Sequence, residues 1–221
     1  MIVAAVPVKD LVNAKQRLMR VLTASERRDL ARAMLCDVLR ALRDAHLDRV
    51  WVVTREPEIA AIAAAMGAQP LGEDDNRGHT AAVAVAQAEA ARVGAAVFVT
   101  IPGDVPCVTE RELRALAAAA AGAPAVFVPS HSGLGTNGAA LAPPQVMPLR
   151  FGEPSFDNHL AAARALRLAP RTLALPGLAL DVDTPEDLRA LAAAGAHTES
   201  GRLVAGWTLD ERLRAAGAGA R

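Results

Sequence analysis

The sequence has little of what marks several common classes of protein. Aromatic residues make up only 3 % of its 221 residues, and tyrosine is absent. Acidic and basic residues balance at 24 each, so no net charge attracts nucleic acid or an anionic membrane surface. The two cysteines, Cys36 and Cys107, are too few for a disulfide scaffold and are typical of a protein in a reducing compartment.

Long apolar runs are missing as well. No convincing run of about 18 or more uncharged apolar residues is present, so the sequence predicts no membrane span. The first ten residues lack the basic region and the long apolar region of a signal peptide. We therefore expect a cytoplasmic protein with neither a membrane nor a nucleic acid as partner. A homodimer is the default expectation, because homodimers are the commonest assemblies of soluble proteins.

Lysine is the scarcest charged residue. All but two of the 24 basic residues are arginine, and the two lysines, Lys9 and Lys15, lie in one N-terminal polar segment. Lysine is a compact point charge, whereas arginine is a planar fork, and a tight phosphate pocket is one place where this difference matters. The alternative is that both lysines stand by chance in a surface loop. We predict that the segment binds the phosphates of a nucleotide.

Small apolar residues are abundant, and short apolar runs alternate with amphipathic stretches. Apolar residues make up 52 % of the chain, and many of them are alanine. Buried strands are predicted at 2–6, 50–54, 96–101, 125–128 and 138–141, with further strand signals in 172–182. Helices are predicted at about 25–45, 56–66, 80–93, 110–121, 157–166 and 184–195, with a short one near 208–215.

This alternation predicts a single-domain α/β protein: a mainly parallel, Rossmann-like sheet with helices on both faces. We divide the domain into a nucleotide-binding half (1–110), an acceptor-binding half (111–195) and a C-terminal extension (196–221). Ligands of such sheets bind beyond the carboxyl ends of the strands. Neither the dinucleotide fingerprint G-x-G-x-x-G nor the P-loop pattern follows the first strand, which argues against a dehydrogenase and a P-loop kinase or ATPase.

Asp104 is the first candidate metal ligand. It lies in segment 101–106 (IPGDVP), where a buried strand ends abruptly in a glycine and two prolines. Magnesium prefers hard oxygen ligands and usually takes one or two protein carboxylates together with substrate phosphates. The alternative is a turn aspartate that caps the next helix, but Thr109 is better placed as that cap.

Two more acids follow the last strand signal. Segment 180–185 (LDVDTP) places Asp181 and Asp183 just before a helix that Thr184 caps. Two positions apart in an extended chain, the acids face the same side, so either could bind the metal opposite Asp104. We assign the second ligand to Asp183 and keep Asp181 as the alternative; in the simpler interpretation both have only local structural roles.

Read together, five segments resemble the CofC family, the guanylyltransferases of coenzyme F(420) biosynthesis, within the GT-A-like nucleotidyltransferases. They are 6–18 (VPVKDLVNAKQRL), 101–106 (IPGDVP), 134–141 (LGTNGAAL), 151–159 (FGEPSFDNH) and 180–188 (LDVDTPEDL). IPGDVP and LDVDTPEDL are general to the superfamily. AKQRL, GTN and the FG-x-x-SF-x-x-H pattern point to the narrower family, and together the matches span most of the chain.

The resemblance implies a metal-dependent guanylyl transfer. GTP would bind with its triphosphate near Lys15, which with Asp104 would be catalytic, and Mg²⁺ would bridge Asp104, Asp183 and the phosphates. The acceptor would be a three-carbon phospho-acid: phosphoenolpyruvate, 2-phospho-L-lactate or 3-phospho-D-glycerate. It would be joined to GMP with release of pyrophosphate. By position in the family motifs, the acceptor would contact Thr136, Gly152 and Ser155.

The segment expected to bind the guanine base departs from the family pattern. Many relatives carry Gly-Leu-Asn where this chain has Gly78-His79-Thr80, although Asn76 is close. We assign Lys9, Asn76 and Gly78, besides Lys15, to nucleotide binding. Two rival interpretations stay open: a related enzyme acting on a sugar phosphate or molybdopterin, and a non-catalytic nucleotide-binding protein.

Overall fold

The computed structural model describes residues 1–221 except 12–13, 73–77, 210, 213 and 215–221. The strands are β1 (Ile2–Pro7), β2 (Arg49–Val53), β3 (Gln69–Leu71), β4 (Val97–Thr100), β5 (Ala125–Pro129), β6 (Thr136–Leu141) and β7 (Arg171–Thr172). The helices are η1 (Gln16–Leu18), α1 (Ala24–Asp44), α2 (Pro57–Ala65), α3 (His79–Arg92), α4 (Glu110–Ala119), α5 (Ser155–Ala165), α6 (Pro176–Ala179), α7 (Pro185–Ala194) and α8 (Glu199–Ala205). None of the described helices is long and apolar enough to cross a membrane.

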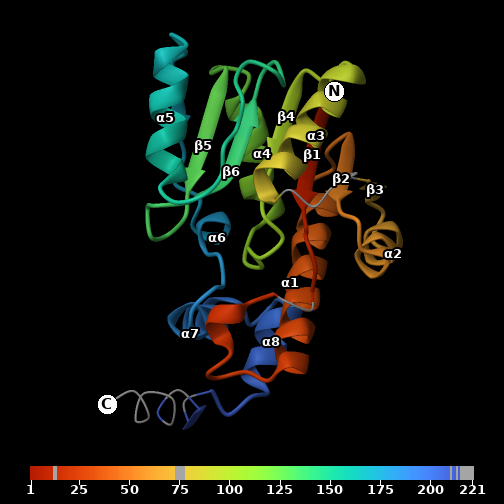
Figure 1. Ribbon diagram of the computed structural model, residues 1–221, viewed down its shortest axis with the longest axis vertical. Coiled ribbons are helices and arrows are strands. Elements are labelled where there is room, and N and C mark those ends of the chain that lie inside the picture. The colour runs from red at the N-terminus through yellow and green to blue at the C-terminus, as the bar shows by residue number, and fades with distance from the viewer. Residues whose placement is uncertain (12–13, 73–77, 210, 213, 215–221) are drawn as a thin grey trace.

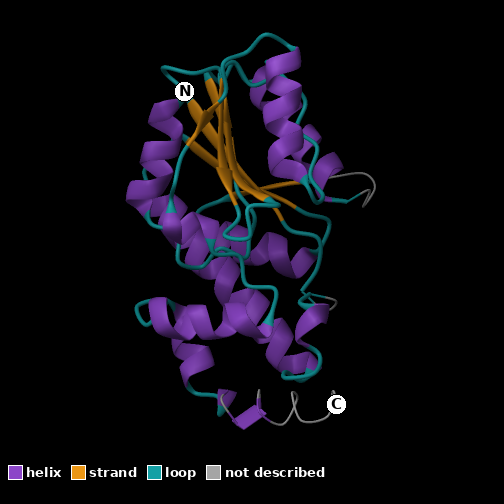
Figure 2. Cartoon of the chain, turned by 90° about the vertical axis from the view of Figure 1, so that its left-hand side faces the viewer, coloured by secondary structure: helices purple, strands orange, loops and turns teal. Residues whose placement is uncertain are grey.

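The described strands form one sheet in the order β3-β2-β1-β4-β6-β5-β7. Strand β6 runs antiparallel to both of its neighbours, and all other neighbouring pairs are parallel. Helices lie on both faces of the sheet (Figure 2). The predicted mainly parallel α/β fold is therefore confirmed.

Apolar side chains fill the space on both faces. One cluster packs α1, α2, α4 and α6 against one face, and a second packs α3 and α5 against the other. A third cluster joins η1, the first half of α1, α7 and α8 beside the sheet. The carboxyl end of β5 points toward α6 and α7 in this part of the molecule (Figure 1). This arrangement leaves the carboxyl ends of β1 and β4 facing the loops that carry the predicted site.

Three capping boxes set the helix starts that the sequence predicts. The side chains of Thr23, Thr109 and Thr184 each accept a hydrogen bond from the backbone N–H three residues on. The acid at that position accepts one from the backbone N–H of the threonine. The side chain of Thr109 therefore caps α4, as expected, and Asp104 is not needed for that role.

The segment 172–182 differs from the sequence prediction. Strand β7 has only two residues, and the Pro-Gly step predicted as part of a strand begins the short helix α6. Proline suits a first helical position, and Gly177 donates its backbone N–H to Glu112 Oε1 at 2.8 Å. A Cβ on Gly177 would lie 2.2 Å from the Cys107 carbonyl oxygen, so only glycine fits this contact between α6 and the loop after Asp104.

Three further elements were not predicted: η1, β3 and α8. Strand β3 has three residues with a central proline, too few for a periodic pattern, and forms by pairing with β2. Helix α8 lies in the stretch expected to be an extension, and the helix predicted near 208–215 includes residues 210, 213 and 215, outside the described part of the chain.

A buried carboxylate holds α8 against α1. Asp37 Oδ1 accepts hydrogen bonds from Glu199 N at 2.7 Å and Arg40 Nη1 at 2.7 Å. Its Oδ2 accepts from Ser200 N at 2.9 Å and Ser200 Oγ at 2.7 Å. The side chain thus satisfies the free N–H groups at the start of α8 from another helix.

We predict that Asp37→Ala lowers the free energy of unfolding by about 2–4 kcal/mol, because the start of α8 loses a charged hydrogen-bond acceptor that water cannot easily replace. Urea denaturation measures the change. Asp29→Ala, at an exposed site on the same helix, is the control and is expected to change stability by less than about 0.5 kcal/mol. Equal stability of both variants would contradict the anchoring role.

Candidate active site

The candidate site lies at the edge of the sheet where β1 and β4 end. Strand β6 runs the other way, with Ala139 opposite Thr100, so β6 begins at the edge where β4 ends. The loop after β1 carries Lys9 and Lys15, the loop after β4 carries Asp104, and β6 begins with Thr136. The topology therefore brings most of the predicted site residues to one edge, as expected for a parallel α/β sheet.

The centre of the site is an ion triad. The Lys15 ammonium donates hydrogen bonds to Asp104 Oδ2 at 2.5 Å and to Asp183 Oδ1 at 2.8 Å. These residues come from three loops far apart in the sequence. The Lys15 side chain is 6 % exposed, whereas those of Asp104 and Asp183 are 29 % and 41 % exposed. The carboxylates thus share a buried cation and keep part of their surface open to a ligand.

The backbone of Lys15 is held in an unusual conformation. Its φ of 57° and ψ of 42° lie in the left-handed region, which a residue with a side chain adopts only at a cost. The following turn, η1, buries Leu18 in the third apolar cluster. Packing of this turn and the two ion pairs hold Lys15 in this conformation.

The charges in the triad stabilise one another. Burial lowers the pKa of Lys15, but the two carboxylates outweigh burial and raise its pKa above the ordinary value. Burial raises the pKa of Asp183, but Lys15 outweighs it and the net pKa is lowered. At neutral pH the site therefore contains a charged ammonium and an ionised Asp183.

Main-chain bonds fix Asp183 relative to Asp104. Val182 N donates to the Asp104 carbonyl oxygen at 3.1 Å, which ties the two acidic segments together. Asp183 N and Thr184 N both donate to Asp187 Oδ2, at 3.0 and 2.7 Å, so the capping carboxylate of α7 also shapes the turn that presents Asp183.

Asp181 has a different partner. Its Oδ1 accepts a hydrogen bond from Asn137 Nδ2 at 2.9 Å, and the same amide donates to the Ala179 carbonyl oxygen. Burial is the main cause that raises the pKa of Asp181, and the charge of Asp104 adds to it. Asp183 thus forms an ion pair with Lys15, whereas Asp181 accepts a hydrogen bond from the Asn137 amide.

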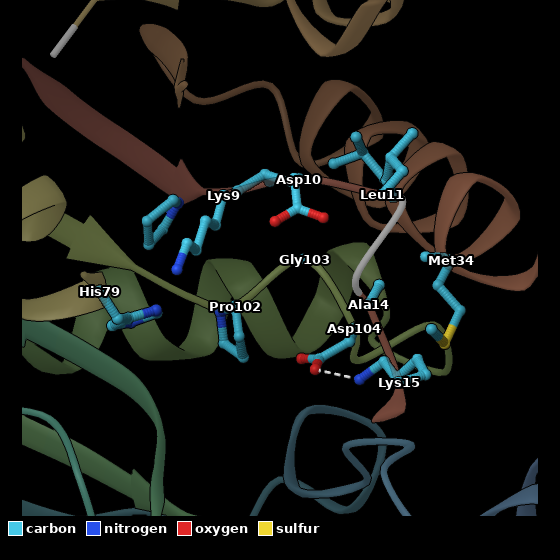
Figure 3. A pocket seen from close by; sticks show the side chains of 14 residues that line it. Lys9, Asp10, Leu11, Ala14, Lys15, Met34, His79, Pro102, Gly103 and Asp104 are labelled. Carbon is cyan, nitrogen blue, oxygen red and sulfur yellow. Dashed lines mark hydrogen bonds and ion pairs between the residues drawn. The ribbon is translucent and has the colours of Figure 1, made fainter. Parts of the chain in front are cut away.

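A cavity of about 240 Å³ extends from the triad along the loop after β1. Lys9 and His79 lie toward one end and Asp104 with Lys15 toward the other, with Pro102 and Gly103 between them (Figure 3). A Cβ on Gly103 would lie 3.2 Å from Val8 Cγ2, so glycine lets the two loops approach closely.

The predicted base-binding segment is described only in part. Gly78 precedes α3 with a φ of 93°, which favours glycine, and His79 is the first residue of that helix and lines the cavity. Asn76 lies outside the described residues.

Two of the three residues predicted to bind the acceptor acid are hydrogen-bonded to each other. Thr136 N donates to Ser155 Oγ at 2.9 Å, and Ser155 Oγ lies 3.3 Å from Thr136 Oγ1. Ser155 is the first residue of α5, which starts two residues earlier than the predicted helix 157–166. Gly152 has a φ of 120° in the adjoining exposed turn, a conformation that favours glycine.

The sequence interpretation did not assign His159 to the site. The structure buries this ring, 2 % exposed, against Thr136 and the backbone of Arg150. The available signal was its spacing, because His159 follows Ser155 by four residues and so shares its face of α5.

The described residues contain no group of three or more His, Cys, Asp or Glu side chains arranged to hold a metal. Two partly exposed carboxylates beside one ammonium instead suit a cation that takes most of its remaining ligands from a phosphorylated substrate.

Comparisons with known proteins identify the family. The chain matches the family model described as "Guanylyl transferase CofC like" over residues 2–211. A phosphoenolpyruvate guanylyltransferase of Conexibacter woesei is 38 % identical over 214 residues, which covers 96 % of each chain. A 2-phospho-L-lactate guanylyltransferase of Methanothermobacter thermautotrophicus is 35 % identical over 197 residues, covering 89 % of this chain and 86 % of the relative.

Solved structures share the fold. A putative nucleotide-diphospho-sugar transferase from Desulfovibrio desulfuricans G20 aligns with a TM-score of 0.80 at 17 % identity, over 97 % of each chain. A nucleotidyl transferase from Methanothermobacter aligns with a TM-score of 0.61 at 18 % identity, over 97 % of this chain and 99 % of the other. At these identities the likeness concerns the fold alone. The family match over nearly the whole sequence confirms the resemblance seen in its motifs: the chain belongs to the CofC family of guanylyl transferases.

Proposed function

We propose that this enzyme joins the GMP moiety of GTP to a three-carbon phospho-acid, in the biosynthesis of coenzyme F(420). The observation that carries the proposal is the convergence of Asp104 and Asp183 on Lys15, which together with Asp104 lines one end of the cavity. The curated relatives act, by their names, on phosphoenolpyruvate or 2-phospho-L-lactate. Because its two cysteines are free and it has no described membrane helix, we assign the enzyme to the cytoplasm.

In the proposed reaction, a phosphate oxygen of the acid attacks the α-phosphorus of GTP. The bond from that phosphorus to the oxygen bridging the α- and β-phosphates breaks, and pyrophosphate leaves with the electron pair. The ionised phosphate needs no general base, so the protein contributes mainly position and charge neutralisation. Lys15 supplies a fixed positive charge. Exposed Lys9 lines the same cavity, as does His79 directly after Gly78, and we assign Lys9 and Gly78 to nucleotide binding.

The site residues fit Mg²⁺. Asp104 and Asp183 both contact the Lys15 ammonium. Both carboxylates are also partly exposed, so that a metal ion with bound phosphates can reach them. Magnesium bound there would polarise the phosphate oxygens and neutralise charge that develops on the leaving pyrophosphate. Asp181 is committed to Asn137 by a hydrogen bond, which favours Asp183 as the second ligand.

The acceptor is assigned to the start of β6. Thr136 and Ser155 are buried and bonded to each other, and Gly152 lies in the exposed turn before α5. Hydroxyl and backbone N–H donors suit the carboxylate and phosphate oxygens of a small phospho-acid.

Pyrophosphate release tests the proposal. We expect GTP with at least one of phosphoenolpyruvate, 2-phospho-L-lactate and 3-phospho-D-glycerate to release pyrophosphate, and the other nucleoside triphosphates to react more slowly. A mass spectrum of the product checks that the acid is linked to GMP. Release with a sugar phosphate but with none of the three acids would assign a different acceptor, and no release with any pair would refute the transferase function.

We predict that Asp104→Asn lowers kcat/KM for pyrophosphate release by at least about 100-fold, because the neutral amide is a much weaker ligand for a divalent cation. Steady-state kinetics at saturating Mg²⁺ measure the loss. Asp29→Asn, on the exposed side of α1, is the control and should keep the native rate. Native activity in Asp104→Asn would exclude a metal role for this carboxylate.

We predict opposite effects of Lys15→Met on metal binding and on turnover. In the absence of nucleotide, removing the ammonium frees both carboxylates, so Mn²⁺ should bind about tenfold more tightly, since a fixed positive charge within 3 Å of each carboxylate repels a second cation. Turnover of GTP should fall by about 100-fold or more, because the phosphates lose a cation. Calorimetric titration measures the first effect, and weaker metal binding in the variant would show that Lys15 supports the metal site rather than competing with it.

A further inference from the structure

A buried polar cluster at the start of α5 contains a histidine to which the proposed reaction gives no role. His159 Nε2 accepts a hydrogen bond from Arg150 N at 2.9 Å, and its Nδ1 lies 3.0 Å from Thr136 Oγ1. The ring stacks on Phe127, with centroids 5.2 Å apart and planes 6° apart, and meets the edge of Phe151 at 5.2 Å. These contacts leave the imidazole one orientation.

The hydrogen bonds also select one tautomer. Because Nε2 accepts from a backbone N–H, the neutral ring must carry its proton on Nδ1. Nδ1 is therefore the donor to Thr136 Oγ1. Burial lowers the pKa of His159 to about 4, so the ring is neutral at physiological pH and the tautomer is maintained.

This arrangement determines what the Thr136 hydroxyl can do. A hydroxyl oxygen accepts two hydrogen bonds. Thr136 Oγ1 accepts one from His159 Nδ1 and one from Ser155 Oγ at 3.3 Å. Its own proton is then left to donate, which is what an anionic ligand requires.

The same histidine holds the turn that contains Gly152. The turn is fixed at Arg150 by His159 Nε2 and at Phe151 by Thr80, whose Oγ1 accepts from Phe151 N at 2.9 Å. Phe151 in turn meets the ring of His79, at the wall of the nucleotide cavity, with centroids 4.5 Å apart. His159 thus contacts both structures assigned to the acceptor.

We propose that His159 is a positioning residue for the acceptor: it orients the Thr136 hydroxyl as a donor and holds the turn 150–154 where a phospho-acid binds. The inference rests on the proposed function, because it deepens the description of the same acceptor site. His159 acts through Thr136 and the turn and does not touch the reacting atoms.

The test separates positioning from stability by its effect on each substrate. His159→Phe keeps an aromatic ring on Phe127 but loses both polar contacts. We expect the KM of the acceptor acid to rise roughly 10-fold to 100-fold, the loss expected for hydrogen bonds to a charged ligand, while the KM of GTP stays within about twofold. Asn158→Ala, at the exposed neighbouring position on α5, is the control and should change neither KM.

A conservative variant and a double-mutant cycle make the test specific. His159→Asn places an amide donor near the position of Nδ1 and should recover much of the affinity for the acceptor. If His159 acts through Thr136, then Thr136→Val combined with His159→Phe should raise the acceptor KM little more than Thr136→Val alone. Where His159→Phe fails to fold, the cycle is made with His159→Ala.

The outcomes distinguish this inference from the function on which it rests. If the native enzyme releases no pyrophosphate with any acid, the proposed function fails. If the native enzyme is active and the His159 variants keep the native acceptor KM, raise both KM values equally, or add fully to Thr136→Val, the positioning role is refuted. A selective, non-additive rise in acceptor KM that His159→Asn relieves supports it.

Discussion

One interaction organises the site: the Lys15 ammonium between the carboxylates of Asp104 and Asp183. It joins the loop after β1, the loop after β4 and the turn before α7, which also meet through main-chain contacts such as Val182 N to the Asp104 carbonyl and through the third apolar cluster. Two carboxylates held this close would repel each other without a cation between them. The buried lysine removes that repulsion, and the raised pKa of its ammonium and the lowered pKa of Asp183 express the same mutual stabilisation. In the mechanism we propose, the Lys15 ammonium thus holds together the two carboxylates that bind the metal.

The rest of the fold supports this contact from both sides. Helix α6, which carries the chain toward Asp181 and Asp183, is docked by Gly177 against the backbone at Cys107, just past Asp104. Helix α7 presents Asp183 through its capping acid Asp187, and α8 is tied to α1 by the buried carboxylate of Asp37. The helices beside the sheet are therefore part of the scaffold of the site, because they fix the turn that brings the second acid to Lys15.

The proposed acceptor site has its own frame on the other face of the sheet. Thr136 and Asn137 are successive residues of β6 and so face opposite sides. Asn137 bonds Asp181 on the side of α6, whereas Thr136 bonds Ser155 and His159 on the side of α5. The start of β6 thus contacts both the segment that carries the second acid and the proposed acceptor site. The edge-to-face contact between Phe151 and His79 joins the turn 150–154 to the nucleotide cavity. A rigid two-sided frame of this kind suits an in-line transfer, in which the position of the two substrates decides the rate.

The sequence alone determined a mainly parallel sheet with most of its strands, most helix starts and the candidate acids, because these depend on local signals: apolar periodicity, capping boxes, and aspartates at the ends of apolar strands. It assigned the second metal ligand to Asp183 but kept Asp181 as the alternative, since alternation places both on one side of an extended strand. Only the actual turn separates them, because it brings Asp183 to Lys15 and Asp181 to Asn137. Nor could the sequence find α6, β3 and α8, which are short and form through contacts with Cys107, β2 and Asp37. The tautomer of His159 and its bond to Thr136 were likewise decided only by tertiary structure, because they depend on a backbone N–H nine residues earlier and on a strand that begins 23 residues before it.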